Sequence, residues 1–350
     1  MDYGYINARM RGMRSRLLSS KALDDLILKP DAESLIADLE NSPYREDIIE
    51  AKGKSTGVDC VENALRQNFI RTFRKIQDLS RQEPEALQYI GIFLHRWDVQ
   101  NIKTVLRGKN IHATNEEILG CLVPAGELDE VTLRELLKQP DVRSVIDLLA
   151  TWKIRYARPL TETWPEFTRT KDLAVLECAL DRYYYADALE SVKAPTYNNN
   201  LIRDLLSLEI DVVNLRTVLR MVRDRVDPAE AGRYLIGGGK DFDLRKLRVL
   251  LANTSIDEVV RALASTRYRF LANIPEAAIR TQKISVIEKE LERFLIKKGV
   301  GSFRLDPLSV APVIGYFWAK FNEITNIRII ARCKTADFPV EHLREELVYV

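Results

Sequence analysis

The sequence has few of the residue types on which metal centres and most catalytic sites depend. Its 350 residues include only three histidines and four cysteines. The histidines form no HExxH motif, and the cysteines stand far apart without a metal-type pairing, which indicates small buried thiols in a reducing compartment. No GxSxG motif occurs, and Gly237–Lys240 fails as a phosphate loop because Tyr234 stands where the leading glycine is required. The sequence therefore predicts no catalytic, cofactor-binding or metal-binding residues.

Long apolar runs and an excess of one charge are also missing. The longest nearly apolar run, Leu308–Ala319, has 12 residues, whereas a membrane span needs about 20. The net charge is +2 without a block of like charges, which gives no strong case for nucleic-acid binding. The chain opens without the apolar core of a secretory signal. We expect no transmembrane segment and a soluble or peripheral protein. Four early arginines favour a solvated helix face over a transit peptide or a headgroup-binding helix: Arg9, Arg11, Arg14 and Arg16.

One pattern occurs three times along the chain. It reads acid, two spacers, Asn, aliphatic and base, with Arg four residues after the base. The three copies are Asp98–Lys109, Asp211–Arg220 and Glu323–Lys334. Their asparagines, Asn101, Asn214 and Asn326, lie 113 (214 minus 101) and 112 (326 minus 214) residues apart. This spacing predicts an internal repeat of about that length.

Each copy is typical of an amphipathic helix with a polar pair beside its apolar face. At 100° per residue, Val99, Ile102 and Leu106 share one arc, into which Asp98 also falls, with Asn101 on its edge. An acid in that place needs a partner, because an unpaired buried charge is very costly. We interpret the repeated acid, Asn and Arg as a structural network. These positions are Asp98, Asn101, Arg107, Asp211, Asn214, Arg220, Glu323, Asn326 and Arg332.

A second landmark repeats with the same period. Glu62, Glu177 and Glu288 each flank an apolar stripe and precede the Asn of their repeat by 39, 37 and 38 residues. We expect each Glu to pair with a base of the Asn helix in its own repeat: Arg107, Arg220 or Arg332. A third match is between residues 31–39 and 141–149, and more loosely 255–263, at offsets of 110 and 114.

The chain contains no convincing strand run, which predicts an all-α fold built from three tandem helical units. Turn-like segments at 122–129 and 235–243, rich in Pro and Gly, set the phase of the repeat. The expected units are residues 1–109, 110–225 and 226–350, combined in one compact protein. Three equivalent units can close around a pseudo-threefold axis.

Several of these segments together resemble a known family. They are Tyr5–Leu18, Arg304–Leu308, Pro312–Tyr316 and the third copy of the repeat, Glu323–Lys334. They look like the C subunit of the A/V-type ATP synthases, the counterpart of the d subunit in V-type ATPases, and the resemblance spans residues 3–350. Cys333 departs from the family, which usually has Gly there, as this chain has at Gly108.

The resemblance implies a non-catalytic, funnel-shaped rotor subunit with pseudo-threefold symmetry. Such a protein would lie peripherally on the cytoplasmic side of the membrane. Its partners would be the membrane rotor ring, on which it is seated, and the central stalk, for which it forms a socket. It would transmit torque that couples ATP synthesis or hydrolysis to proton or sodium transport, without a cofactor, a small-molecule substrate or an active site of its own.

Two other classes compete with this interpretation. A helical-repeat scaffold of another assembly would also be built from tandem units, but such units have about 33 to 47 residues rather than about 112. A helical enzyme would need convergent titratable groups that are not repeated, whereas the acids here are repeated or scattered.

Divergence among the copies predicts where partners bind. Fold residues recur in every copy, so contact residues should concentrate where the copies differ. The connectors between the Glu and Asn helices, 79–87, 193–201 and 298–309, are such places, and we expect all three to emerge at one end of the funnel. Solvated linkers are the alternative. The candidate contacts are Tyr197, Asn198, Asn199, Asn200, Phe303 and Arg304.

Overall fold

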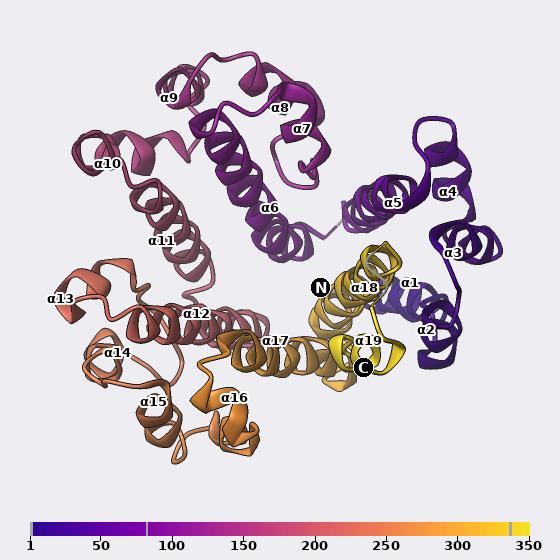
Figure 1. Ribbon diagram of the computed structural model, residues 1–350. Coiled ribbons are helices and arrows are strands. Elements are labelled where there is room, and N and C mark those ends of the chain that lie inside the picture. Colours follow the sequence, from indigo (N-terminus) through magenta and orange to yellow (C-terminus); the bar gives the residue numbers. More distant parts are fainter. Residues whose placement is uncertain (1–2, 82, 336–337) are drawn as a thin grey trace. The chain divides into compact units, whose positions relative to one another are not determined.

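The described part of the chain consists of helices joined by turns and irregular segments (Figure 1). The computed structural model describes residues 3–81, 83–335 and 338–350, and these ranges contain no strand. The all-α prediction is thus confirmed. None of the helices in these ranges combines the length and the apolar composition that crossing a membrane requires.

Six long helices carry the two repeated landmarks. The helices with the repeated Asn, here called the Asn helices, are α6 (Pro84–Asn110), α12 (Tyr197–Arg223) and α18 (Ala311–Cys333). Those with the repeated Glu, the Glu helices, are α5 (Gly57–Leu79), α11 (Ala174–Ser191) and α17 (Ile284–Gly301). The shorter helices are α1 (Gly4–Arg14), α2 (Ser20–Ile27), α3 (Ala32–Leu39), α4 (Arg45–Lys52), α7 (Asn115–Gly120), α8 (Glu130–Leu137), α9 (Val142–Thr151), α10 (Ala157–Thr170), α13 (Pro228–Ala231), α14 (Leu244–Leu251), α15 (Ile256–Ala262), α16 (Glu276–Arg280) and α19 (Val340–Glu346), with 3-10 turns η1 (Gly232–Tyr234), η2 (Arg269–Asn273) and η3 (Ser302–Arg304).

Helix starts recur with the repeat because their capping residues do. The side chains of Asp31, Asp141 and Ser255 each accept a hydrogen bond from the backbone N–H three residues on, at the starts of α3, α9 and α15. The same cap begins α2, α8 and α14, from Ser19, Asp129 and Asp243. Such caps satisfy N–H groups that the helix itself leaves unpaired. The matched segments at 31–39, 141–149 and 255–263 therefore each begin a helix with the same kind of cap.

The chain divides into two compact units. Unit 1 consists of Met1–Phe93 and Ile296–Val350, and unit 2 of Leu94–Leu295. The predicted three units, 1–109, 110–225 and 226–350, are not tested by this division and stay a prediction.

Unit 1 joins the two ends of the chain in one core. The Asn helix α18 packs against α1, α2, α5 and α19. Aromatic rings fill the contact between α5 and α18: Phe73 lies 4.4 Å from Phe69 and 4.6 Å from Phe317, measured between ring centroids. Every residue of α18 from Ala311 to Lys320 is buried, so all of the longest apolar run of the sequence except Leu308 lies in the interior of this unit.

Unit 2 contains the other two Asn helices and the elements that follow each of them. The residues α6 contributes from Leu94 onwards are followed by α7 to α11, and α12 is followed by α13 to α16 and the part of α17 up to Leu295. Helix α10 packs on α9 and α11, while α12 packs on α11, α14 and α15. Aliphatic side chains from these short helices, such as Leu136, Val145 and Ile146, are fully buried in the shared core.

The expectation of buried thiols is only partly right. Cys60 is buried, Cys178 and Cys333 are half-buried, and Cys121 is exposed at the end of α7. Cys121 is the C-cap residue of α7, and its exposure depends on the local path of the chain, which its identity as a cysteine does not reveal.

Candidate functional site

The repeated asparagines each clamp one residue of the following segment. The Nδ2 of Asn101 donates to the carbonyl of Val123, and the Oδ1 of Asn101 accepts from the N–H of Val123, both at 2.8 Å. Asn214 holds Ile236 in the same way at 2.7 and 2.8 Å. Asn326 holds Val348 at 2.9 and 3.1 Å. The Asn and the residue that it holds are 22 positions apart in all three copies. In each copy, therefore, the Asn side chain fixes the backbone at the equivalent position.

The first two repeated acids bind the backbone near those clamps rather than a base. The carboxylate of Asp98 accepts the N–H groups of Glu127 and Leu128 at 3.0 and 2.9 Å. That of Asp211 accepts those of Asp241 and Phe242 at 2.8 and 3.3 Å. The prediction of a structural role for Asp98 and Asp211 agrees with these bonds, although their main partners are peptide groups instead of the expected basic side chains.

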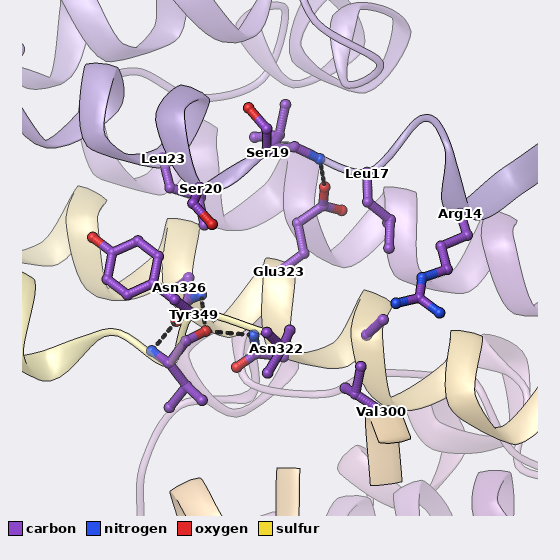
Figure 2. A pocket seen from close by; sticks show the side chains of 14 residues that line it. Arg14, Leu17, Ser19, Ser20, Leu23, Val300, Asn322, Glu323, Asn326 and Tyr349 are labelled. Atoms are coloured by element: carbon purple, nitrogen blue, oxygen red, sulfur yellow. Dashed lines mark hydrogen bonds between the residues drawn. The ribbon is translucent and has the colours of Figure 1, made fainter. Parts of the chain in front are cut away.

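The third acid, Glu323, binds three groups at the surface of a pocket in unit 1. It accepts the N–H of Leu18 at 2.5 Å, the hydroxyl of Tyr44 at 2.6 Å and the ammonium of Lys320 at 2.7 Å. Figure 2 shows Glu323, Asn322 and Asn326 lining this pocket, which has a volume of about 340 Å³. The Oδ1 of Asn322 is buried there without a hydrogen-bond partner among the described residues.

Three buried tyrosines, which are absent from the residues predicted from the sequence, complete the repeated network. Tyr44, Tyr156 and Tyr268 lie 112 residues apart (156 minus 44, 268 minus 156) and are at most 2% exposed. Tyr44 donates to Glu323, and Tyr268 donates to Asp211 at 3.2 Å. Tyr156 instead donates to the carbonyl of His95 at 3.4 Å, one turn from Asp98. Their common spacing is a signal that a search for repeated aromatic residues would have found.

Burial shifts the pKa values of this network. It raises the pKa of Asp98 to about 6, against the opposing effect of the two backbone N–H groups. Burial also raises the pKa of Asp211 above its ordinary value. The pKa of Tyr44 is raised well above its usual range by burial and then by the Glu323 carboxylate. Burial therefore favours the protonated forms of these three groups in the folded chain.

The predicted pairing of each repeated Glu within its own repeat is wrong. Glu177 meets Arg107 at 2.5 Å and Glu288 meets Arg220 at 2.6 Å, in each case the arginine of the preceding copy. Glu62, in the first copy, meets Arg332 of the last copy at 2.6 Å. Helices α11 and α17 thus each face the Asn helix of the preceding copy, whereas α5 faces the Asn helix of the last copy. The prediction chose the arginine of the same repeat because the Glu helix and the Asn helix of one repeat, such as α5 and α6, are consecutive in the chain.

A further ion pair in unit 2 joins two equivalent positions. Arg96 and Glu209 each stand five residues before the repeated Asn (101 minus 96, 214 minus 209). The Nη1 of Arg96 lies 2.7 Å from the Oε1 of Glu209, whose side chain is 1% exposed. The hydroxyl of Tyr185 donates to the same carboxylate at 2.9 Å. Equivalent residues of α6 and α12 thus touch, which places this pair at the point where the two helices meet.

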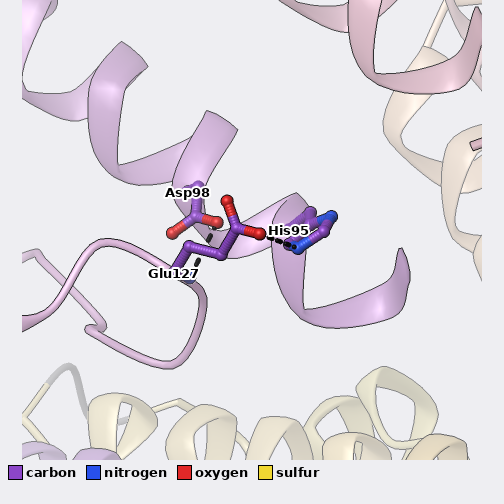
Figure 3. Close-up of side chains that lie close together, drawn as sticks. All are labelled: His95, Asp98 and Glu127. Carbon is purple, nitrogen blue, oxygen red and sulfur yellow. Dashed lines mark hydrogen bonds and ion pairs between the residues drawn. The ribbon is translucent and has the colours of Figure 1, made fainter. Parts of the chain in front are cut away.

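His95, Asp98 and Glu127 form the one group in the described ranges with ligand atoms close enough for a metal ion, all within 4.8 Å of one another (Figure 3). Protein groups already satisfy them. The Oε1 of Glu127 lies 3.0 Å from the Nε2 of His95 and 2.9 Å from a guanidinium nitrogen of Arg155. A guanidinium beside a carboxylate opposes binding of a second cation. We assign this cluster to the internal network of unit 2.

The predicted contact segments are less loop-like than expected. Tyr197, Asn198, Asn199 and Asn200 form the first turn of α12. Asn199 is buried and donates to the carbonyl of Ala194, so its role is internal. Tyr197 is 54% exposed, and Asn200 is also exposed. The connector predicted at 193–201 is therefore shorter than expected, because Thr196 caps α12 by accepting the N–H of Asn199.

The second contact segment follows α17. Phe303 and Arg304 lie in η3, where the guanidinium of Arg14 stacks over the Phe303 ring at 4.0 Å. Phe303 is thereby held in unit 1, whereas Arg304 is exposed. Two neighbouring leucines are also exposed, Leu305 at 46% and Leu308 at 70%. The first connector, 79–87, includes residue 82, which lies outside the described residues.

Comparison with known proteins gives a match along almost the whole chain. Residues 6–346 match the ATP synthase (C/AC39) subunit family. A protein of Methanococcoides burtonii, named as the C subunit of an A-type ATP synthase, is 32% identical over 350 residues, which cover 99% of this chain and 94% of that protein. Proteins with the same name from Haloferax volcanii and Methanocaldococcus jannaschii are 31% and 28% identical, and they cover 98% and 99% of this chain and 97% and 86% of their own lengths.

Proposed function

Because this chain belongs to the ATP synthase (C/AC39) subunit family, we propose that it is the non-catalytic rotor subunit of an A/V-type ATP synthase. In this role it sits peripherally on the cytoplasmic side of the membrane. One end rests on the membrane ring and the other is a socket for the central stalk. The protein transmits torque between them and so couples ATP synthesis or hydrolysis to proton or sodium transport.

The observation that carries this proposal is the family match over residues 6–346. The network of the described residues supports a mechanical role. Asp98 and Asp211 accept backbone N–H groups, and Glu323 accepts Leu18, Tyr44 and Lys320. Groups engaged in this way hold helices together, which is what a torque-bearing part requires.

A pseudo-threefold funnel of three repeats is the architecture we propose for this role. Its support is the recurrence of one clamp: Asn101, Asn214 and Asn326 each bind the residue 22 positions later through both amide groups. Equivalent helical units built around equivalent clamps can close around an axis. Closure would leave two mouths, one for the ring and one for the stalk.

We propose partner contacts at the exposed residues of the segments in which the three copies differ. Tyr197 and Asn200 at the start of α12 are candidates, and Arg304 after α17 is another. The exposed Leu305 and Leu308 add apolar area beside Arg304, and aromatic or apolar anchors next to an arginine are frequent in protein interfaces. Asn198 belongs to the same turn, while Asn199 and Phe303 support the neighbouring backbone.

The test is purification of the intact ATPase from cells that carry a tagged copy of this chain. Ring and central-stalk proteins should co-purify with the tag. Arg304→Glu, or shortening of Tyr197–Asn200, should uncouple ATP hydrolysis from ion transport and leave the isolated chain folded. Arg245→Glu, an exposed position on α14, is the control and should keep transport coupled. Isolation of the tagged chain without ring or stalk, together with full coupling in both contact variants, would exclude this function.

A further inference from the structure

A basic cleft opens on unit 1 beside the part of the repeated network that contains Tyr44 and Glu323. It has a volume of about 550 Å³ and lies among α4, α5, α18 and the end of α1. Its cationic lining comes from Arg16 in the turn after α1, Arg45 at the start of α4, Arg71 and Lys75 on α5, and Lys320 on α18. Ligand sites for small molecules have volumes of about 300 to 1,000 Å³.

Three of these cations have no ion-pair or hydrogen-bond partner for their side chains among the described residues: Arg16, Arg45 and Lys75. All three are exposed at the cleft. Cations that converge on one cleft without counter-charges raise the local positive potential and attract anions. The cleft thus presents positively charged side chains that are available to bind an anion.

The acidic side chains around the cleft already form ion pairs with basic residues of the cleft. Arg71 donates to Glu46 at 2.5 Å and to Asp47 at 2.6 Å. Asp47 is buried, and its pKa is raised by burial in spite of the hydrogen bond from Asn68 and the charge of Arg71. Lys320 is held by Glu323 and Tyr44. Glu46, which is 80% exposed, is therefore the one acid of the lining that competes with an incoming anion for Arg71.

An unsatisfied acceptor points to more than a bare anion. Asn68 is 5% exposed and lines the cleft, and its amide nitrogen donates to Asp47 at 2.7 Å. Its Oδ1 is buried without any donor among the described residues. A buried polar atom without a partner is rare and costly. This oxygen has almost no accessible surface, so a hydroxyl or amino group on the ligand would satisfy it once the Asn68 amide turns toward the cleft.

The internal repeat provides a comparison within the same chain. Arg71 and Lys75 stand 9 and 13 residues after Glu62, where the other copies have Ala186 and Glu190, and Lys297 and Gly301. Lys320 stands six residues before Asn326, where the other copies have His95 and Leu208. Arg45 follows Tyr44, where they have Ala157 and Arg269. Two of these eight counterparts are lysine or arginine, so the fold common to the copies does not require the cluster.

We propose that this cleft binds a soluble organic phosphate with two or more negative charges and a hydroxyl or amino donor, the chemistry of a nucleoside di- or triphosphate. Arg45, Lys75 and Arg16 contact the phosphate oxygens, where the guanidinium groups suit bidentate binding. Asn68 accepts from the donor group of the ligand. Binding at this site is independent of the rotor role proposed above.

The experiment measures binding of ATP, pyrophosphate and inorganic phosphate to the full chain by calorimetry at low ionic strength, with the melting temperature as a second readout. ATP and pyrophosphate should bind and raise the melting temperature. Arg45→Gln combined with Lys75→Gln should weaken binding about tenfold or more, because each lost contact is charge-assisted. Arg245→Gln removes one charge from an exposed arginine of α14 in unit 2 and should leave the affinity unchanged.

One variant should strengthen binding. Glu46→Gln removes the competing carboxylate and frees Arg71 for the ligand, so the affinity for pyrophosphate should rise several-fold. No binding of ATP or pyrophosphate to the wild-type chain would overturn the proposal. Binding that the double variant and Glu46→Gln leave unchanged would overturn it too. Vesicles that contain phosphatidylglycerol test the other source of phosphate, and binding to them alone would overturn the assignment of a soluble ligand.

Discussion

In each of the three matched segments, one buried asparagine side chain holds the backbone of the residue 22 positions later. Asn214 on α12 is fully buried and forms hydrogen bonds with both the N–H and the carbonyl of Ile236. Ile236 lies in an irregular segment, outside any helix that would supply these hydrogen bonds. A buried peptide group without a partner costs about 1 to 3 kcal/mol. The amide therefore replaces the regular secondary structure that this turn lacks.

Asn214→Ala should lower the free energy of unfolding by about 2 to 5 kcal/mol, because the N–H and the carbonyl of Ile236 both lose their partner. Urea unfolding of the purified chain measures this loss. Asn110→Ala, at the exposed end of α6, is the control and should stay within about 0.5 kcal/mol of wild type. Equal stability of Asn214→Ala and the control would show that the clamp does not support the fold.

The raised pKa of Asp98 gives a pH dependence whose sign is fixed. Its folded-state pKa, about 6, exceeds the ordinary 3.8, so the folded chain binds more protons than the unfolded chain between these values. The contribution of this carboxyl is full below about pH 4 and is lost as the pH rises through 6. Relative to Asp98→Asn, the wild type should lose about 3 kcal/mol of unfolding free energy between pH 4 and pH 7. His95, Glu127 and Tyr156 face the carboxyl and are unchanged in this comparison.

A capping aspartate provides the control for that pH series. Hydrogen bonds from Ser144 lower the pKa of Asp141, so its contribution is present above its unfolded-state pKa and is lost as the pH falls. The difference between wild type and Asp141→Asn should therefore change in the opposite direction. Parallel profiles for the two variants would contradict the assignment for Asp98.

Among the elements, the contact between a Glu helix and an Asn helix is held partly by exposed ion pairs. The side chain of Glu62 is 23% exposed, that of Arg332 is 67% exposed and that of Arg328 is 28% exposed. From the sequence, Arg332 was instead expected to form a buried pair with Glu288 of its own repeat, whose truncation would cost about 3 to 5 kcal/mol. Exposed pairs contribute only about 0 to 1 kcal/mol because water and salt screen them.

Arg332→Ala should therefore cost less than about 1 kcal/mol of unfolding free energy. Glu62→Gln should cost more than Arg332→Ala, because Glu62 holds Arg328 as well as Arg332. A double-mutant cycle for Glu62 and Arg332 in urea gives the coupling energy directly. A coupling of several kcal/mol would mean that the pair is more shielded than its exposure indicates.

A close approach of two elements in unit 1 depends on glycine. A Cβ atom on Gly315 of α18 would lie 2.4 Å from the backbone nitrogen of Phe303 in η3, and backbone cannot move as a side chain can. Gly315→Ala should lower the unfolding free energy by about 1 to 3 kcal/mol or more. Gly12→Ala on α1, where nothing lies within 4 Å, should instead raise it by about 0.5 to 1 kcal/mol through helix propensity. Thermal unfolding of both variants shows whether each change raises or lowers stability. A stabilising Gly315→Ala would refute the close packing of Gly315 against Phe303.

For the molecule as a whole, the sequence predicted what depends on residue type and failed where contacts depend on the path of the chain. The period was visible because Asn101, Asn214 and Asn326 keep one identity. The partners of Glu62, Glu177 and Glu288 were assigned wrongly, because two arginines of equal type offered equal chemistry and only the fold decides between them. The backbone groups of Val123, Ile236 and Val348 carry no identity of their own, although an aliphatic residue 22 positions after each Asn was a usable sign.

The central claim is that this chain turns together with the membrane ring and the central stalk. The most direct measurement is ATP-driven ion transport by the intact ATPase after this chain has been covalently crosslinked to the ring or to the stalk, for instance through a cysteine at Arg304 or Tyr197. Parts that rotate together can be joined without blocking rotation, so transport should continue at the rate of the complex before crosslinking. Loss of transport in proportion to the crosslinked fraction would show that this chain moves against its partner, and would contradict the rotor assignment.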